Sequence, residues 1–190
     1  LSMPINILFD ILAPIYDRVI GDRDPAEMVD VLELSNEVSL LDVGGGTGRV
    51  SSDLRKHVSN LYLVDLSLTM LGEAKKKGIQ DLSSTSSENL PFQSNSIDRI
   101  MVMDALHHFP NQEKVIEELF RVVKPGGIIL IEEPDINRLL VKLIAIAEKL
   151  ALMGSHIHSP TEINKMMRKF SSNINIIPNE RISAWIIGRK

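Results

Sequence analysis

Four glycines in five positions, within the stretch LLDVGGGTGRV (40–50), constrain this chain more than any other feature. They follow an apolar run that contains Asp42. Glycine loses more conformational entropy on folding than any other residue, so this concentration requires either a turn of unusual shape or a ligand close to the main chain. A glycine-rich turn between a strand and a helix, with no ligand, is the simpler alternative.

Apolar runs that predict strands alternate along the chain with capped or amphipathic segments that predict helices. This alternation predicts an α/β fold with a doubly wound, mainly parallel sheet and helices on both faces. The last two apolar runs lie only a few residues apart, so they predict an antiparallel edge. KPGG (124–127) predicts a turn, and 79–85 predicts a weak seventh strand. The other strands are expected at 38–43, 61–65, 97–106, 128–133, 174–178 and 182–190, and helices at 24–34, 49–58, 67–78, 111–123, 137–153 and 159–170.

The composition narrows the class of protein. A chain of 190 residues with 44% hydrophobic residues is expected to form one domain with its own core. The formal net charge of −4 argues against a general affinity for nucleic acid, and the lack of cysteine removes disulfides and thiolate metal sites. Residues 139–153 are the most apolar stretch, but they are too few and too charged to span a bilayer. Without a signal-peptide pattern, we expect a cytoplasmic protein that does not insert into membranes.

The spacing of the glycines selects among nucleotide ligands. A phosphate-binding P-loop and the dinucleotide fingerprint both need glycine or another small residue where this chain has Arg49, which disfavours a nicotinamide cofactor. Asp65 ends the next predicted strand. An acid at that place accepts hydrogen bonds from ribose hydroxyls in doubly wound folds, although it can also cap the helix that begins near Ser67.

Taken together, these motifs resemble those of the class I S-adenosylmethionine-dependent methyltransferases, over nearly the whole chain. LLDVGGGTGRV resembles the cofactor loop of that family, and LVDLS (63–67) resembles its ribose-binding strand end. SENLPFQSNSIDRIMVMDALHHF (87–109) and LFRVVKPGGIILIEE (119–133) are similar to its fourth and fifth strand regions. The resemblance implies a Rossmann-like methyltransferase fold, S-adenosyl-L-methionine as cofactor and S-adenosyl-L-homocysteine as product.

The resemblance also implies the residues of the cofactor site. The glycine backbone and Asp42 would hold the methionyl end, and Asp65 the ribose. Relatives commonly have an Asp that contacts the adenine amino group where this chain has Ser86, so a solvated loop over 83–87 is an alternative. The full implied set is Tyr16, Asp42, Gly44, Gly45, Gly46, Gly48, Asp65, Leu66, Ser87, Glu88, Asn89, Asp104 and Ala105.

The amino-terminal stretch LFDILAPIYDRVIG (8–21) is similar to the start of the ubiquinone/menaquinone C-methyltransferase group. This narrower likeness implies a single methyltransferase domain over 1–190, with a lid helix in 1–23 and a substrate-side helical segment in 134–160. Tyr16 would then be a lid residue, and a tyrosine packed at the rim of the core is the alternative.

Methyl transfer is an in-line displacement, so alignment and water exclusion contribute most, and a general base is needed only when the nucleophile must lose a proton. His107 and His108 follow the fourth predicted strand. His107 better matches the family pattern and is the candidate catalytic residue, with a structural histidine as the alternative. His156 and His158 alternate as metal ligands can, but no nearby carboxylate or cysteine supports them, so no metal site is predicted.

The sequence therefore predicts methyl transfer to a small-molecule acceptor, such as an apolar quinol-like ring. A non-catalytic or regulatory S-adenosylmethionine-binding protein with the same fold is the alternative. Residues 139–153 could cover the acceptor, form a homodimer interface or pack on the sheet. Nucleic acid is disfavoured as substrate, because the fourth strand leads into MDALHH (103–108), where base-amino methylases carry paired prolines and an aromatic residue.

Overall fold

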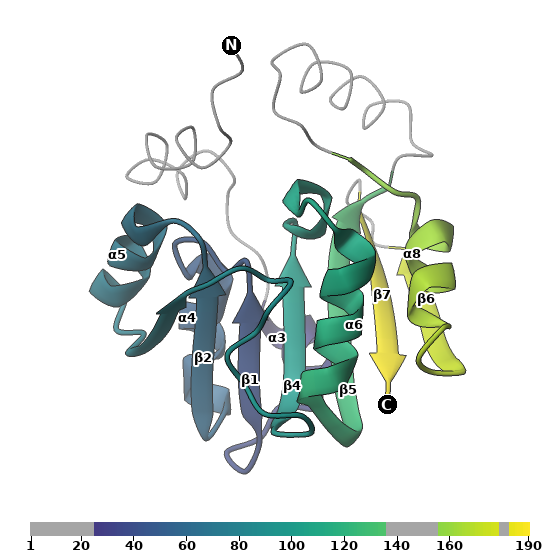
Figure 1. The fold of residues 1–190 in the computed structure, drawn as a ribbon. Helices are drawn as coiled ribbons and strands as arrows, with labels where there is room; N and C mark the ends of the chain where they lie inside the picture. Colours follow the sequence, from purple (N-terminus) through teal and green to yellow (C-terminus); the bar gives the residue numbers. More distant parts are fainter. Residues whose placement is uncertain (1–24, 136–155, 179–182) are drawn as a thin grey trace, which may run out of the picture.

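A single seven-stranded sheet organises the computed structural model, which describes residues 25–135, 156–178 and 183–190. The strand order is β3-β2-β1-β4-β5-β7-β6 (Figure 1). Strands β1 to β5 are parallel, and β7 is antiparallel to both of its neighbours, β5 and β6. The predicted doubly wound, mainly parallel sheet is confirmed. The strands are β1 Ser39–Val43, β2 Asn60–Asp65, β3 Asp81–Ser84, β4 Ile97–Met103, β5 Val123–Pro134, β6 Asn173–Pro178 and β7 Ser183–Arg189.

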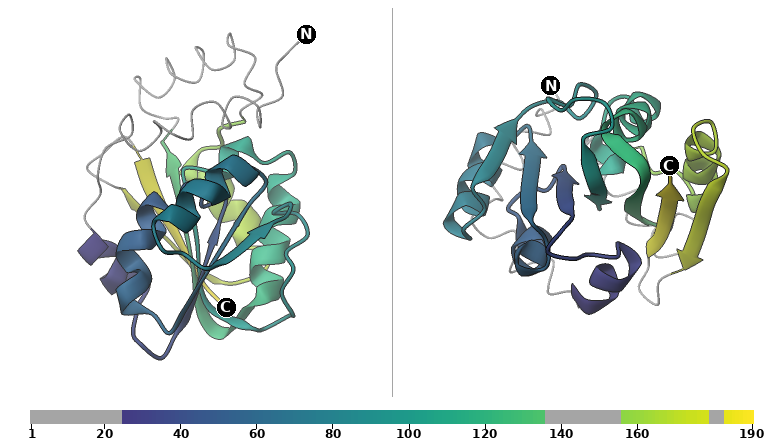
Figure 2. Two further views of the ribbon diagram at one scale, coloured as in Figure 1. Left: turned by 90° about the vertical axis from the view of Figure 1, so that its left-hand side faces the viewer. Right: turned by 90° about the horizontal axis from the view of Figure 1, so that it is seen from below.

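Helices cover both faces of this sheet (Figure 2). Helices α3, α4 and α5 contribute to the hydrophobic cluster on one face, whereas α6 and α8 contribute to the cluster on the other. The predicted cap of α5 is confirmed, because Ser67 Oγ accepts a hydrogen bond from the Met70 amide at 3.1 Å. The helices are α3 Pro25–Val31, α4 Arg49–Leu54, α5 Leu68–Lys76, α6 Gln112–Val122 and α8 Pro160–Met167, with 3₁₀ turns η1 Arg55–His57 and η2 Leu106–His108.

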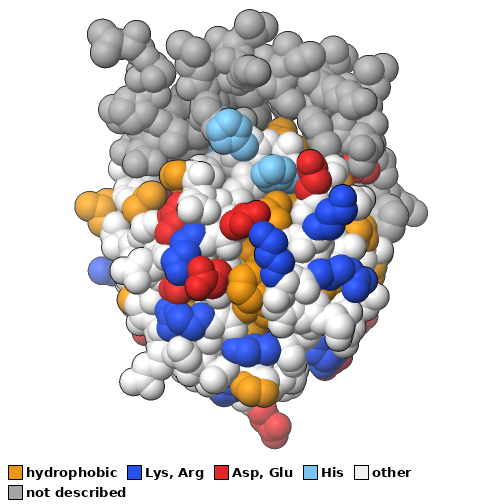
Figure 3. Space-filling model, turned by 45° about the vertical axis from the view of Figure 1, so that its right-hand side comes forward, with side chains coloured by type: hydrophobic (Ala, Val, Ile, Leu, Met, Phe, Trp, Pro, Cys, Tyr) orange, Lys and Arg blue, Asp and Glu red, His pale blue; other side chains and the backbone are white. Residues whose placement is uncertain are grey.

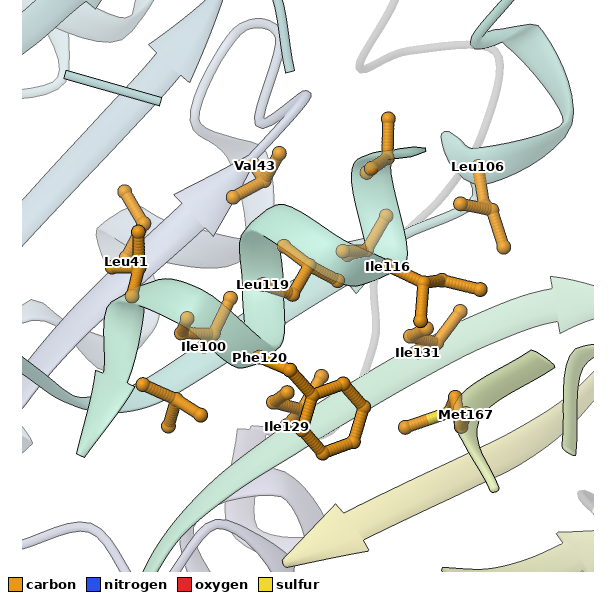
Figure 4. Packing of buried hydrophobic residues seen from close by; sticks show 14 of the residues in the cluster. Leu41, Val43, Ile100, Leu106, Ile116, Leu119, Phe120, Ile129, Ile131 and Met167 are labelled. Atoms are coloured by element: carbon orange, nitrogen blue, oxygen red, sulfur yellow. The ribbon is translucent and has the colours of Figure 1, made fainter. Parts of the chain in front are cut away.

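The central strands are buried on both faces, which is why β1 reads as a continuous apolar run. Figure 4 shows side chains of α6, including Ile116, Leu119 and Phe120, packed over Ile100 of β4 and Ile129 of β5. Full burial of one such side chain contributes roughly 1.5–3 kcal/mol. This packing holds the carboxyl ends of β1, β2, β4 and β5 at one edge of the sheet, the edge where ligands bind in doubly wound folds.

Two local expectations need correction. KPGG is not a separate turn: β5 already begins at Val123, which pairs with Ile97, and the four residues form an irregularity inside the strand. Gly126 supports it with φ of 78°. Strand β4 ends at Met103 rather than at residue 106, because the chain turns off the sheet at the next residue. The expected antiparallel edge is confirmed: β7 pairs antiparallel with β5 and with β6, the outermost strand.

Candidate functional site

A cavity of about 300 Å³ opens at the carboxyl edge of the sheet. It is lined by segments that follow β1, β2, β3 and β4, so four parts of the chain meet there. Ten of the residues predicted for the cofactor line it: Asp42, Gly44, Gly45, Gly46, Asp65, Leu66, Ser87, Glu88, Asp104 and Ala105. Gly48, Asn89 and His107 are not among its lining residues, and Tyr16 lies outside the described residues.

Gly46 and Gly48 have different structural roles in the loop. A Cβ at Gly48 would collide with Ile79 Cδ1 in the core, so this glycine allows α4 to pack closely on α5 and the strand after it. A Cβ at Gly46 would find only Met70 Sδ, at 3.9 Å. Both residues have positive φ, 68° and 55° respectively, which L-residues other than glycine rarely adopt. Gly46 therefore presents bare backbone to the cavity, whereas Gly48 is a packing glycine.

Gly44 and Gly45 are confined by side chains of the site itself. A Cβ at Gly44 would lie 2.8 Å from Phe109 Cζ, and a Cβ at Gly45 would lie 2.5 Å from Asp42 Oδ2. The loop thus lies directly between the carboxylate of β1 and the segment that follows β4. Side chains on these two glycines would push apart the walls of the cavity.

Asp65 joins the glycine loop to the start of α5. Its Oδ2 accepts a hydrogen bond from the Gly46 amide at 2.9 Å, and its Oδ1 accepts one from the Ser67 amide at 2.8 Å. The side chain of Ser67, and not that of Asp65, caps α5. Asp65 also lines the cavity.

Asp42 differs from Asp65 in its electrostatics. Its side chain is only 2% exposed, and its Oδ2 accepts a hydrogen bond from the Ser51 hydroxyl. Its Oδ1 has no hydrogen-bond partner within the described part of the chain. Burial raises the pKa of Asp42 to about 7, and the nearby charge of Asp65 adds to this effect. A buried carboxylate oxygen at a cavity wall, with nothing to bind, fits a cationic donor on a ligand.

The segment after β4 forms the opposite wall. Asp104, which is not glycine, has φ of 51° and donates its amide to the Glu132 carbonyl at 2.9 Å. This conformation is strained for a non-glycine residue, and such strain is concentrated at functional sites. It turns the chain into η2, and His108, at the end of η2, lines the cavity together with Phe109 and Pro110.

The two adjacent histidines point to different surroundings. His107 is 6% exposed, and its Nδ1 lies 2.6 Å from Glu133 Oε2, behind the cavity wall. His108 lines the cavity, and burial lowers the pKa of His108 to about 3, with His107 adding to the shift. Its imidazole is therefore neutral at pH 7. Of the two histidines, His108 lines the cavity and His107 does not. The sequence does not indicate which of the two lies there.

The segment 86–92 is hydrogen-bonded to α6 and its cap. Glu118 Oε2 accepts the Leu90 amide at 2.9 Å, and Arg121 donates to the Phe92 carbonyl at 2.8 Å. Hydrogen bonding to Arg121 holds the pKa of Glu118 below its usual range. Glu88 accepts a hydrogen bond from the Ser86 hydroxyl. Ser87 and Glu88 are thereby fixed at the cavity, rather than carried on a solvated loop.

Neither a metal site nor a membrane-spanning helix is found within the described residues. No group of three or more His, Cys, Asp or Glu side chains there could hold a metal ion. His156 and His158 do not converge: the His156 amide donates to the His107 carbonyl at 2.9 Å, and His158 Nδ1 lies 3.7 Å from Glu162 Oε2. None of the helices described is long and apolar enough to cross a bilayer.

Comparisons with known proteins agree with this geometry. Residues 41–131 match the methyltransferase domain family. The demethylmenaquinone methyltransferase of Paenarthrobacter aurescens (strain TC1) is 32% identical over 135 residues, which are 66% of this chain and 53% of that protein. These findings support the assignment of residues 41–131 to the class I S-adenosylmethionine-dependent methyltransferases.

A second relative and a solved structure extend the comparison. The chloroplastic 2-methyl-6-phytyl-1,4-hydroquinone methyltransferase of Spinacia oleracea is 34% identical over 61% of this chain and 37% of its own length. An S-adenosylmethionine-dependent methyltransferase from Thermotoga maritima shares the fold, with a TM-score of 0.80, 20% identity and coverage of 96% and 98% of the two chains. This methyltransferase chain thus spans about half or less of the two curated relatives.

S-adenosylmethionine is the cofactor of this family, and the residues at the cavity fit it. The unpartnered Asp42 Oδ1 suits the cofactor's ammonium group, and the open backbone at Gly46 allows close approach. Asp65, at the end of β2, suits the ribose hydroxyls. S-adenosylmethionine carries no phosphate, so its binding does not require a P-loop, and the sequence does not contain one.

Proposed function

We propose that this methyltransferase transfers the methyl group of S-adenosylmethionine to a small-molecule acceptor in the cavity at the carboxyl edge of its sheet. One observation carries the proposal: the buried Asp42 Oδ1, without a partner in the part of the chain described, borders a cavity with open glycine backbone. The cytoplasmic location stays a prediction. A homodimer through 139–153 also stays a prediction, because that segment lies outside the described residues.

Each wall of the cavity has its own part in this proposal. When bound, S-adenosylmethionine supplies a methyl group activated on a sulfonium. Asp42 and Asp65 hold and orient it by charge-assisted and neutral hydrogen bonds. Ala105 and Phe109, from the opposite wall, exclude water from the reacting atoms. His108 offers a neutral imidazole that can hydrogen-bond a hydroxyl or amine of the acceptor.

An apolar quinol-like ring is the acceptor that we favour. Both curated relatives are named for methylation of a quinone or hydroquinone, and the cavity offers an apolar lining that includes Met103 and Phe109. Nucleic acid is disfavoured. On the face shown in Figure 3, which lies over α6 and α8, acidic and basic side chains are interspersed instead of forming a basic stripe.

A non-catalytic cofactor-binding protein is the second candidate. It is favoured by the low pKa of His108, because a group with a pKa of about 3 is a weak general base at neutral pH. Acceptors that need no deprotonation would not require a base, so the observation does not exclude catalysis.

The two candidates are separated by turnover. The protein is incubated with S-adenosylmethionine and a water-soluble dihydroquinone, with a phenol and an amine in parallel, and S-adenosylhomocysteine is measured by mass spectrometry. We expect acceptor-dependent formation of S-adenosylhomocysteine, which Asp42→Asn reduces. Tight binding of S-adenosylhomocysteine without turnover on any acceptor would favour the non-catalytic candidate.

A further inference from the structure

We propose that Glu133 is a positioning residue of this methyltransferase: together with His107, it holds the η2 turn so that His108 faces the acceptor side of the cavity. The inference rests on the proposed function only where it names an acceptor. Glu133 itself does not line the cavity.

Both carboxylate oxygens of Glu133 are used on consecutive residues of the turn. Oε1 accepts the Leu106 amide at 2.7 Å, and Oε2 lies 2.6 Å from His107 Nδ1. Glu133 is 1% exposed and lies near the end of β5, which is anchored between β4 and β7. A carboxylate buried this deeply is costly unless hydrogen bonds compensate for its lost hydration. The two bonds supply that compensation and fix the beginning of η2.

His107 is held from a second direction as well. Its carbonyl accepts the His156 amide at 2.9 Å, and the His156 carbonyl accepts Gln112 Nε2 at 2.7 Å. Glu133 of β5 therefore holds the imidazole of His107, and the segment before α8, itself bonded to the start of α6, holds its backbone. The ring of His107 lies against that of His108, with centroids 3.9 Å apart. A shift of His107 would therefore displace the imidazole at the cavity wall.

The neutral state of His108 is a consequence of this placement. The ring is largely withdrawn from water and lies beside His107, and both effects lower its pKa. A neutral imidazole has one donor and one acceptor nitrogen, which suits a hydroxyl or amine on the acceptor. Other charged groups face the same cavity and stay unchanged in the variants below: Asp42, Arg49, Asp65, Glu88 and Asp104.

Glu132 provides a matched control for Glu133. It is the preceding residue of β5 and is also 1% exposed, but its carboxylate bonds to Ser183 Oγ and Trp185 Nε1, both at 2.8 Å. These partners lie on β7 and not on η2. Glu132→Gln therefore removes a buried charge from the same strand without touching the histidine turn.

The test compares Glu133→Ala, Glu133→Gln and Glu132→Gln by titrating the His108 imidazole with NMR, with His108→Asn used to assign the signal. In wild type and Glu132→Gln, we expect no titration of His108 between pH 8 and pH 5. In Glu133→Ala, we expect the released ring to titrate toward its ordinary value, about 6.5. Glu133→Gln keeps one acceptor oxygen for the turn, so the pKa of His108 in this variant should lie between those in wild type and in Glu133→Ala. An unchanged His108 titration in both Glu133 variants would overturn the inference.

Binding and turnover give an independent readout. The dissociation constant of S-adenosylhomocysteine should stay within about two-fold in every variant. With the acceptor that gives turnover in wild type, kcat should fall roughly a hundred-fold in Glu133→Ala and less in Glu133→Gln, as for a misplaced catalytic geometry. If Glu133→Ala does not fold, the inference is tested by comparing the His108 titration and kcat of Glu133→Gln with those of Glu132→Gln. Failure of wild type to bind S-adenosylhomocysteine would contradict the proposed function, whereas failure of the His108 comparison would contradict only this inference.

Discussion

The two walls of the cavity are built in different ways. The wall after β1 comes from one stretch, Gly44 to Val50, of which all residues but Gly48 line the cavity, three of them glycines. The wall after β4 meets it through side chains, His108 and Phe109, whose turn is set by Glu133, more than twenty residues away. The first wall is specified by neighbours in the sequence, and the second by partners that only the fold brings close.

This difference predicts different consequences of substitution. Changes in the glycine wall should disturb folding or cofactor affinity, because backbone shape and Asp42 are both formed there. Changes behind the histidine wall should alter transfer while leaving cofactor affinity nearly intact.

The largest effect is expected for Gly48→Ala. The new Cβ would collide with Ile79 at a backbone φ of 68°, so overpacking and strain combine. We expect the free energy of unfolding to fall by about 2–4 kcal/mol in urea titrations. Gly72→Ala is the control, since its Cβ would meet nothing within 4 Å and helix α5 should gain up to about 1 kcal/mol. Equal stability of the two variants would refute the packing role of Gly48.

The same contrast explains what the sequence could predict. The glycine loop, Asp42, Asp65 and the order of strands and helices were predictable, because each depends on local spacing. The strand at Asp81–Ser84 looked weak because it is polar and incompletely buried, and only its pairing with β2 completes it. The irregularity at KPGG depends on pairing between Val123 and Ile97, which no local pattern reveals.

The histidine pair was the least predictable part of the site. The doublet in the sequence does not indicate which of the two rings lines the cavity. That choice depends on Glu133, whose side chain takes His107 behind the wall. The packing role of Gly48 was not predictable either, because Ile79, which follows α5 in the sequence, comes close to it only in the fold.

Asp42→Asn should produce the largest loss of affinity. Loss of one charge-assisted hydrogen bond weakens binding of S-adenosylhomocysteine by roughly ten- to a hundred-fold in calorimetry. Because burial disfavours the charged carboxylate, the same variant should be at least as stable as wild type at pH 8. Unchanged affinity would exclude Asp42 from the cofactor site.

The pH dependence of cofactor affinity follows from the same residue. The pKa of Asp42 is raised to about 7, so the carboxyl is protonated below that pH and cannot attract an ammonium group. The dissociation constant should rise up to about ten-fold per pH unit below 7 and level off above it. The contribution of Asp42 to folding has the opposite sense: it is fully present below the ordinary carboxyl pKa and is lost as pH rises through 7. Asp42→Asn should flatten both profiles.

Arg49→Met should have a moderate, ligand-dependent effect. Arg49 lines the cavity, and its charge opposes the rise of the pKa of Asp42. We expect a loss of about ten-fold in affinity for S-adenosylhomocysteine, which carries a carboxylate. Methylthioadenosine lacks that group and should bind both proteins equally. Equal losses for the two ligands would assign Arg49 to folding of the loop.

The smallest effect is expected at the apolar rim. Leu66 is 50% exposed and lines the cavity, whereas Leu68 is 73% exposed and does not. Leu66→Ser should weaken S-adenosylhomocysteine binding by roughly three- to ten-fold, and Leu68→Ser by less than about two-fold. A larger loss of affinity in Leu68→Ser than in Leu66→Ser would contradict the placement of the nucleoside end of the site beside the end of β2.

The most direct measurement is calorimetric titration of the wild-type protein and Asp42→Asn with S-adenosylmethionine, S-adenosylhomocysteine and NADH at pH 8. The account predicts micromolar binding of both sulfur compounds, roughly ten-fold or greater weakening in Asp42→Asn, and no binding of NADH. Folded wild-type protein that binds neither sulfur compound, or that binds NADH in their place, would contradict the assignment of this cavity.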